Sequence, residues 1–342
     1  AMLLHRVTRA PEKRVFTIDV GNIPPNEVDA YMQRLMQKMK KTPYIDSQTG
    51  EFMEILSNIE LPESKRWGYN KMIGKSQYFN RYTFIKDNIL FIPLQFWFCR
   101  HISQALPLVG LQYHEIKINV FLRDFDESWY SGVDMTDRPA QSLISIDGRL
   151  HCDFVFLSNE ERRFFAKGHH KYLIEQVQIH DGNGIAQNTV NENIEVFFNH
   201  PIKELFWIYK ADAIRNTNDW VNFSRTLNYY ETNVEPEEPL KACQWKINGH
   251  DLMEEKSAPY FRLVNAYKYY NRIPNNYIYL HSFSMEPHRF QPSGHLNFSM
   301  LNSVLLYLTF TDNIPAGSIT VYARNYNILE IKNGQAALMY SA

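Results

Sequence analysis

Cysteine, glycine and long apolar runs are all scarce in this sequence of 342 residues. Cys99, Cys152 and Cys243 stand far apart, so they offer neither a disulfide framework nor a paired metal-binding motif, and they suit a reducing compartment. The longest apolar stretch is short, running only from Phe91 to Phe98, whereas a membrane-spanning helix needs about 20 such residues. Residues 1–4 are too few for the apolar core of a secretory signal. We therefore expect no transmembrane segment and no secretory signal.

An excess of charge of one sign is also missing, because 36 Lys and Arg oppose 37 Asp and Glu. Binding of nucleic acid through bulk charge requires a surplus of cations that release counterions, so the sequence predicts no such binding. The balance hides an asymmetry: residues 1–50 carry eight basic and five acidic side chains. The start of the chain is therefore basic and the remainder is acidic.

Aromatic residues are abundant: they make up 14% of the chain, with 22 Phe, 21 Tyr and 6 Trp. Large flat side chains favour β-strands. In Ile116–Leu122 the apolar residues alternate with Lys117, Asn119 and Phe121, which is typical of a strand with one buried face. Similar patterns predict strands at 14–20, 195–198, 204–210, 277–283, 304–310 and 318–323. Many short strands separated by turns favour a β-sandwich.

Two helices and several turns interrupt these strands. From Val28 to Met39 apolar residues recur at helical spacing, after Pro24 and Pro25. Ser158 and Glu161 form a potential capping box at the start of a second helix that Gly168 ends. Turns are predicted at Asp181–Gly184 and Asn248–Gly249, and a loop at Val234–Pro239.

No set of residues stands out as a catalytic or cofactor site. His151, His169, His170 and His180 could form a metal cluster, but adjacent histidines point in different directions and no Cys or carboxylate stands at ligand spacing. Asp181–Gly184 lacks the third glycine and the Lys-Ser/Thr of a phosphate loop. Cys99 follows Phe96-Trp-Phe98, which indicates a buried thiol rather than a nucleophile. We predict no catalytic, cofactor-binding or metal-binding residue, and no enzyme.

Two further patterns allow a functional and a structural interpretation. Asn222-Phe-Ser224 and Asn297-Phe-Ser299 match the N-glycosylation acceptor pattern, which also arises by chance. The aromatic runs Phe206–Tyr209 and Tyr267–Tyr270 could stack nucleic-acid bases, but no basic groove accompanies them. A core or a subunit interface explains these runs better. The residues alone thus predict an aromatic-rich β-sandwich, with a structural or binding role favoured by elimination.

A series of segments resembles the major capsid proteins of nucleocytoplasmic large DNA viruses, in the family's order and spacing from about residue 52 to residue 342. These segments are Lys65–Gly74, Phe91–Arg100, Ala105–Ile116, Glu160–Phe165, Tyr172–Gln176, Phe198–Leu205, Ile247–Asp251, Gln291–Gly294, Asn297–Ser299 and Val321–Asn327.

The resemblance implies an all-β double jelly roll, in which each roll has two sheets with strand orders B-I-D-G and C-H-E-F. It also implies a structural function in an icosahedral capsid, where three copies form a pseudo-hexagonal capsomer. The expected partners are this chain itself, neighbouring capsomers and minor capsid proteins, with possible glycans and no sequence-specific nucleic acid. The expected location is the virion, after synthesis in the host cytoplasm.

Residues 1–51 depart from this pattern, because the early strands of the first jelly roll are absent. The segments Met2–Phe16, Ile18–Asn22, Tyr31–Lys41 and Tyr44–Gly50 instead resemble an internal piece of the portal protein of T-even-type phages. We therefore predict a chimeric or truncated chain: a portal-like strand-helix leader at 1–51, the end of an incomplete first jelly roll at 52–138, and a second jelly roll at 139–342. The junction would lie near Glu51–Met53.

This division predicts that the second jelly roll folds alone and cooperatively, whereas residues 1–138 do not. Late strands without early partners would expose edges and an apolar face, and the intact chain would form no normal capsomer trimer. Three alternatives remain at this stage. They are a carbohydrate- or receptor-binding β-sandwich, a cupin-type jelly-roll metalloenzyme, and a DNA-packaging portal subunit.

Overall fold

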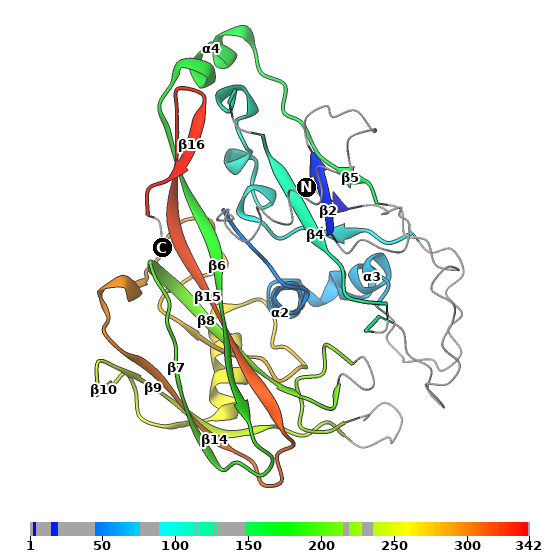
Figure 1. Ribbon diagram of the computed structural model, residues 1–342, viewed down its shortest axis with the longest axis vertical. Helices are drawn as coiled ribbons and strands as arrows, with labels where there is room; N and C mark the ends of the chain where they lie inside the picture. Colours follow the sequence, from blue (N-terminus) through cyan, green and yellow to red (C-terminus); the bar gives the residue numbers. More distant parts are fainter. Residues whose placement is uncertain are drawn as a thin grey trace.

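The computed structural model describes residues 3–4, 15–19, 45–75, 89–113, 115–125, 127–128, 148–214, 219–227 and 235–340 (Figure 1). The helix predicted at 28–39 lies outside these residues. Within them, no helix is long and apolar enough to span a bilayer.

Strands dominate the second half of the chain, and the helices are short. The α-helices are α2 (Gly50–Ile59), α3 (Glu63–Ile73), α4 (Asn159–Lys167) and α7 (Asn265–Tyr269). The tighter or wider helical turns are η2 (Trp97–Cys99), η3 (Ile102–Gln104), η4 (Leu108–Gly110), η6 (Tyr260–Val264) and η7 (Phe298–Met300).

The strands of the first half are β1 (Leu3–Leu4), β2 (Val15–Asp19), β3 (Ile92–Pro93), β4 (Lys117–Phe121) and β5 (Leu150–His151). Those of the second half are β6 (His170–Ile185), β7 (Asn191–Glu195), β8 (Pro201–Ala211), β9 (Leu240–Ile247), β10 (His250–Asp251), β11 (Lys256–Ser257), β12 (Tyr279–Ser282), β13 (Leu296–Asn297), β14 (Val304–Phe310), β15 (Gly317–Lys332) and β16 (Gln335–Leu338).

The second half forms a sandwich of two antiparallel sheets (Figure 1). In one sheet β6 pairs with β15, β15 with β8, and β8 with β12. In the other, β7 pairs with β14, β14 with β9, and β9 with the short β10 and β11. Read in chain order, these are the B-I-D-G and C-H-E-F orders that the resemblance implied for a jelly roll.

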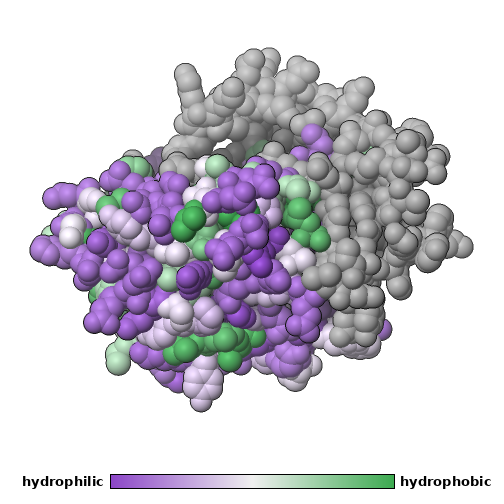
Figure 2. Space-filling view, turned by 90° about the horizontal axis from the view of Figure 1, so that it is seen from below, coloured by the Kyte–Doolittle hydropathy of each residue, from purple (hydrophilic) through white to green (hydrophobic). Residues whose placement is uncertain are grey.

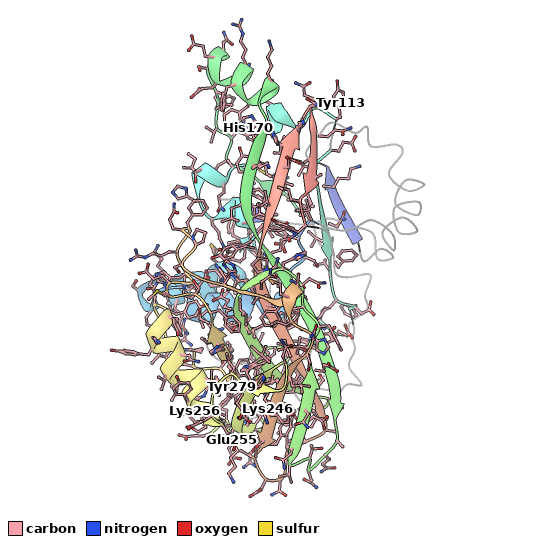
Figure 3. The ribbon with its side chains drawn as sticks, turned by 90° about the vertical axis from the view of Figure 1, so that its left-hand side faces the viewer. Tyr113, His170, Lys246, Glu255, Lys256 and Tyr279 are labelled. Carbon is pink, nitrogen blue, oxygen red and sulfur yellow. The ribbon has the colours of Figure 1, made fainter. Side chains whose placement is uncertain are left out.

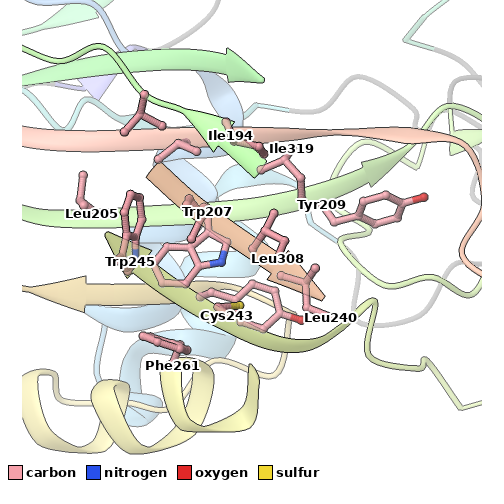
Figure 4. Packing of buried hydrophobic residues seen from close by; sticks show 14 of the residues in the cluster. Ile194, Leu205, Trp207, Tyr209, Leu240, Cys243, Trp245, Phe261, Leu308 and Ile319 are labelled. Atoms are coloured by element: carbon pink, nitrogen blue, oxygen red, sulfur yellow. The ribbon is translucent and has the colours of Figure 1, made fainter. Parts of the chain in front are cut away.

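Aromatic side chains fill the space between the two sheets (Figure 4). Trp207 on β8 lies with its ring centroid 5.5 Å from Trp245 on β9 and 5.2 Å from Phe261 on η6, edge to face in both cases. Edge-to-face contacts of this kind stabilise aromatic pairs beyond the area they bury. The aromatic run Phe206–Tyr209 is fully buried, which confirms the core interpretation of that run.

Strand predictions succeeded where alternation marks a half-buried strand. Residues 304–310 coincide with β14, whose side chains alternate between buried and half-buried. The predictions at 204–210 and 318–323 fall inside the longer β8 and β15, and the prediction at 277–283 contains β12. The prediction at 195–198 was wrong, because β7 ends at Glu195.

Of the helix cap and the turns predicted from short sequence patterns, one turn was wrong. The capping box at Ser158 and Glu161 is present at the start of α4. Asn248 and Gly249 form the two-residue turn between β9 and β10, both with positive φ, as a type I′ turn requires. Asp181–Gly184 is not a turn: it lies within β6, where Gly182 and its neighbour oppose the single residue Ile319 in a β-bulge. A Cβ at Gly182 would lie 2.2 Å from the Ile319 carbonyl oxygen, so glycine is required there.

The described strands of the first half form only small sheets. β1 pairs with β3 and with β5, and β2 pairs with β4 over Val15–Asp19 and Lys117–Phe121. The strand predicted at 14–20 is therefore confirmed by β2, and the alternation at 116–122 by β4. Strands that precede residue 51 pair with strands that follow it, so the predicted leader and the capsid-like segment share sheets.

Helix α2 crosses the predicted junction at Glu51–Met53 without a break. The Thr49 hydroxyl caps it by accepting a hydrogen bond from the Phe52 amide at 3.2 Å. Its apolar face consists of four buried side chains, Phe52, Ile55, Leu56 and Ile59. These pack on the outer face of the β6-β15-β8-β12 sheet, against Phe206, Ile208, Leu280 and Tyr322. The junction is therefore not a structural boundary.

The segment that precedes α2 also contacts the second half. The Val177 amide on β6 donates a hydrogen bond of 3.0 Å to the Asp46 carboxylate, and the Gln176 side chain donates to the Ile45 carbonyl. Burial raises the pKa of Asp46 to about 6, although the hydrogen bonds that its carboxylate accepts from the Val177 and Ser47 amides and the Gln48 side chain favour its charged form. Residues 45–59 thus cover a face that the second jelly roll would otherwise expose.

A fragment of residues 139–342 should consequently melt at least roughly 10 °C below the full chain, because the four buried apolar side chains of α2 each contribute about 1.5–3 kcal/mol and a loss of about 1 kcal/mol lowers the melting temperature of a domain of this size by roughly 2–4 °C. A peptide of residues 45–60 added in trans should raise the melting temperature of that fragment. The control is the same peptide with Phe52→Ser and Ile55→Ser, which should have no effect. Equal melting temperatures for fragment and full chain would show that α2 adds nothing to the second jelly roll.

Candidate functional site

A cluster of three cations and three carboxylates lies beneath α2, where the two halves of the chain meet. Its members come from five segments: Glu60 at the end of α2, Arg100 after η2, Glu175 on β6, Lys203 and Glu204 on β8, and Arg324 on β15. Lys203, Glu204 and Arg324 are almost completely buried. Buried charges are tolerated only when they are paired, so this cluster is the most constrained electrostatic feature of the described residues.

Arg324 is the centre of the cluster. One of its terminal nitrogens, Nη1, donates to Glu60 Oε1 at 2.6 Å, and Nη2 donates to Glu175 Oε2 at 3.0 Å. Nη1 also lies 2.9 Å from Glu204 Oε1. A planar guanidinium with several fixed donors can hydrogen-bond two carboxylates and remain an ion-pair partner of a third, which a lysine could not do.

Lys203 and Arg100 complete the balance of charge. The Lys203 ammonium donates to Glu175 Oε1 and, at 2.8 Å, to the Pro287 carbonyl. Arg100 lies 3.5 Å from both Glu60 Oε2 and Glu175 Oε2. Glu175 therefore faces three cations, and the loop that carries Pro287 is fastened to the same cluster.

The carboxylates differ sharply in their electrostatic surroundings. Burial alone would raise the pKa of Glu175, but Arg324, Lys203 and Arg100 outweigh it and hold that pKa far below its usual value. The pKa of Glu60 shifts downward for the same reasons, through Arg100 and Arg324. In Glu204 burial prevails and raises the pKa to about 7, since neither of its oxygens accepts a hydrogen bond from the described residues. Burial and the neighbouring Arg324 lower the pKa of Lys203 to about 8.

This arrangement can hold segments together but has no means of reaching a substrate. Lys203 and Glu204 have no exposed surface, and a sheet and a helix enclose them. Its ion pairs hold Glu60 and Arg100 against the B-I-D-G sheet, so the role of the cluster is structural.

The histidines singled out from the sequence do not converge. His169 lies 2.5 Å from the Glu330 carboxylate. His170, near α4 in Figure 3, contacts the Phe165 carbonyl at 3.3 Å. His180 packs against the rings of Phe197 and Phe198 farther along β6. In the part of the chain that the structure describes, no group of three or more His, Cys, Asp or Glu could hold a metal ion.

The other residues singled out from the sequence are a cysteine, two glycosylation patterns and an aromatic run, and the contacts described for them are structural. Cys99 ends η2 and is half-buried. Asn222 of the first sequon is 2% exposed, and its side-chain oxygen accepts hydrogen bonds from the Ser224 amide and hydroxyl. Asn297 of the second is half-buried on β13 and accepts from the Ser299 amide. In the run Tyr267–Tyr270, which begins within α7, Tyr270 is buried and Tyr267 is 79% exposed.

A cavity of about 280 Å³ lies between α2, α3 and the loops near residues 222 and 275. Its charged lining is already paired: Lys75 with Glu54, and Arg272 with Glu63 on α3. It holds no obvious reactive group.

Five of the six charged residues of this cluster lie in segments that carry the resemblance to capsid proteins, but the sequence alone does not mark them as a cluster. Glu175, Lys203 with Glu204, Arg324 and Arg100 lie within Tyr172–Gln176, Phe198–Leu205, Val321–Asn327 and Phe91–Arg100. A charged residue within an otherwise apolar strand was the only local sign of this cluster. Its ion-pair partners could not be identified, because they lie far away in the sequence.

Elsewhere the visible surface is polar. Seen from the end of the molecule opposite α4, hydrophilic residues cover most of the described surface, and hydrophobic residues form small separate patches (Figure 2).

Comparisons with known proteins place this fold among viral capsid proteins. Residues 161–337 match the family model described as large eukaryotic DNA virus major capsid protein, and residues 29–158 match that of the major capsid protein N-terminus. The major capsid protein of Phaeocystis pouchetii virus is 27% identical over 414 aligned positions, covering 87% of this chain and 78% of the relative. That of Pyramimonas orientalis virus is 32% identical over 275 positions, covering 74% and 61%.

Solved structures agree with the sequence matches. A chain of the PBCV-1 virus capsid superimposes with a TM-score of 0.75 at 23% identity, covering all of this chain and 89% of that one. The Faustovirus major capsid protein gives 0.63 at 13% identity, covering 97% and 74%. The fold is a double jelly roll capsid fold, mostly β with some helices.

The portal interpretation of residues 1–51 needs correction. Residues 29–51 lie inside the match to the capsid N-terminus, and the comparisons support no portal relation. This family match and the continuous helix α2 show that the predicted junction lies within a capsid-like segment.

We predict that Arg324→Met destabilises the chain by about 3–5 kcal/mol, because Glu175 and Glu204 would remain buried with too few cations. Urea unfolding of the purified chain measures this loss. Arg289→Met is the matched control: its pair with Glu286 is exposed, so its cost should stay below about 1 kcal/mol. Equal costs for the two variants would contradict the proposed role of Arg324.

The pH dependence of stability should also report on Glu204. A carboxyl whose pKa rises from 4.5 to about 7 on folding binds a proton only in the folded state between these values, so its contribution to stability falls as the pH rises through that window. Glu204→Gln should remove this decline between pH 5 and pH 8, whereas the exposed Glu195→Gln should keep it. An unchanged pH profile in Glu204→Gln would mean that Glu204 does not titrate in this range.

Proposed function

We propose that copies of this chain assemble as homotrimeric, pseudo-hexagonal capsomers. The basis is that the chain belongs to the family of large eukaryotic DNA virus major capsid proteins. The chain is a major capsid protein of an icosahedral viral capsid, its place is the virion, and its role is structural rather than enzymatic. Other copies of the capsid protein are its partners in the lattice. We also propose that the capsomer contacts neighbouring capsomers and minor capsid proteins.

The observation that carries this proposal is the strand order of the second half. β6-β15-β8-β12 and β7-β14-β9 followed by β10 and β11 reproduce both sheets of a jelly roll, and a buried aromatic core joins them. A rigid sandwich of this kind suits a building block whose function lies in its surfaces. For glycans, Asn297 remains the candidate, since Asn222 is buried. No described feature favours a carbohydrate- or receptor-binding role for the sandwich.

We further propose that residues 139–342 form the second jelly roll, with residues 45–59 covering its outer face, and that residues 52–138 belong to an incomplete first one. The alignment with the Phaeocystis pouchetii virus protein supports this, because it runs over 414 positions whereas the chain has 342 residues. That relative therefore contains internal residues without a counterpart here.

Assembly of the purified full chain tests this function. We expect chemical cross-linking at high concentration to give trimers, because the second jelly roll retains its capsomer surfaces. We also expect sedimentation at low concentration to show smaller species, since the incomplete first jelly roll contributes less contact area. Absence of cross-linked trimers at every concentration would contradict the capsomer proposal. A trimer that survives dilution would contradict the incomplete first roll.

A further inference from the structure

Among the described residues, the sandwich of the second half leaves the edge of one strand bare. β7 pairs with β14 on one side only. The Val196 amide donates to β14 and the Val190 carbonyl accepts from it, so the even-numbered residues face β14. Because backbone groups alternate along a strand, the amides and carbonyls of Asn191, Asn193 and Glu195 point away from the sheet. No described residue hydrogen-bonds to these groups.

The other edges of this sandwich are short or covered. In the sheet that contains β7, the opposite edge consists of β10 and β11, which have two residues each. In the other sheet, residues 45–46 cover β6, where the Val177 amide donates to Asp46. Helix α7 packs along β12, and Asn265 donates to the Leu280 carbonyl. β16 packs against the cluster around Trp97. Since sheets avoid unwanted pairing by covering or shortening their edges, the exception at β7 indicates an edge that receives a partner.

β7 also lacks the features that keep an exposed edge single. It contains neither proline nor lysine, and its pairing with β14 runs without a bulge. Its odd-numbered side chains are exposed, whereas Ile194 lies in the core (Figure 4). Just beyond its two ends, Val190 and Phe197 are 61% and 71% exposed. β7 is therefore a regular, accessible strand of the kind to which a second strand can add.

The charges of β7 restrict the choice of partner. Glu192 and Glu195 are its only ionic residues, so this edge repels an anionic surface such as nucleic acid or acidic lipid. A second β7 in antiparallel orientation fits without conflict. When Asn193 of one copy opposes Asn193 of the other, the two strands overlap completely, and each Asn191 opposes a Glu195. The asparagine carboxamide can then donate to the carboxylate on both sides of the two-fold axis.

Neighbouring registers are less favourable. A ladder centred on residue 192 or on residue 195 would set Glu192 or Glu195 against its own copy, and like charges directly opposite each other destabilise a pair. A ladder centred on Ile194 would leave Asn191 beyond the end of the opposing strand. In the register centred on Asn193, Glu192 opposes Ile194, so no two carboxylates are directly opposed. The register of complete overlap is thus also the one that the charges favour.

We propose that β7 pairs with β7 of a second copy of this chain, as an antiparallel ladder centred on Asn193. The two C-H-E-F sheets then continue into one another across a two-fold axis, with the same patch used on both copies. This contact goes beyond the proposed capsomer, whose contacts are three-fold, and does not depend on it.

Cysteine cross-linking tests the register. Residues that oppose each other in a hydrogen-bonded pair have Cα atoms about 5.5 Å apart, within the range that a disulfide spans. Asn193→Cys in the full chain should therefore give a disulfide-linked dimer on mild oxidation, well above the unaltered chain. Asn191→Cys, on the same face of the same strand, is the matched control: its two copies lie more than about 10 Å apart and should link at least about tenfold less.

A mixture of Asn191→Cys and Glu195→Cys chains should link again, because these two positions oppose each other in the proposed register. No linked dimer from Asn193→Cys would overturn the proposal. Equal yields from Asn193→Cys and Asn191→Cys would overturn it as well, since they would report random collision.

A charge at residue 191 tests the contact without cysteine. In the pair this residue lies beside Glu195 of the other copy, so Asn191→Lys should lower the dissociation constant of the dimer and Asn191→Glu should raise it. Two symmetric pairs predict a change of about two- to thirtyfold in each direction. Sedimentation velocity over a concentration series of the full chain measures these constants. The side chain is exposed, so the melting temperature of the monomer should stay the same in both variants.

A proline at the centre tests the ladder itself. The Asn193 amide faces away from β14, so Asn193→Pro removes a donor of the intermolecular ladder and none of the sheet within the chain. The dissociation constant should rise at least about tenfold, with an unchanged melting temperature of the monomer. A dimer that tolerates this proline would contradict pairing through β7.

The outcomes separate this contact from the proposed capsomer. Trimers that cross-link while Asn193→Cys gives no linked dimer would overturn the β7 contact alone. A linked dimer without trimers would overturn the capsomer alone, and a chain that stays monomeric at every concentration would overturn both. Association that weakens in both Asn191→Lys and Asn191→Glu would identify a partner surface other than β7 at this edge and overturn self-pairing.

Discussion

The pairing of Arg324 with Glu60, Glu175 and Glu204 is the constraint on which the rest of this structure depends. Such a cluster is stable only as a complete set, because the loss of one member leaves an uncompensated charge in a buried region. Its members come from α2, the segment after η2, and three strands of one sheet. Residues that are 264 positions apart in the chain, Glu60 and Arg324, must therefore be in place together.

This requirement explains why the chain is not divided where its sequence first suggested a division. The apolar face of α2 covers Phe206, Ile208 and Tyr322, and Glu60 at its end supplies a charge that the sheet lacks. Burial of apolar area gives most of the stabilising free energy, and the ionic cluster adds specificity of position. The result is a stiff sandwich with a helix fixed to it, which is a suitable unit for a capsid wall.

How much the sequence predicted depended on whether a signal was local. Alternation located β14, and the capping box at Ser158 and the Asn248–Gly249 turn were correctly identified, since each is decided within a few residues. Asp181–Gly184 was misjudged because glycines serve a β-bulge as well as a turn, and only the neighbouring Ile319 on β15 distinguishes them. Phe52, Ile55, Leu56 and Ile59 have helical spacing in the sequence, but the helix they form was not predicted because a junction was placed within it. The ionic cluster could not be predicted, because its partners meet only in the folded chain.

A double-mutant cycle between Glu60 and Arg324 tests the central claim most directly, namely that α2 and the second jelly roll form one cooperative unit through this cluster. Urea unfolding of Glu60→Gln, Arg324→Met and the double variant gives the coupling energy between the two side chains. The account predicts a favourable coupling of about 0.5–3 kcal/mol, since the two groups form a short, largely buried pair. Additive effects, with no coupling, would contradict it.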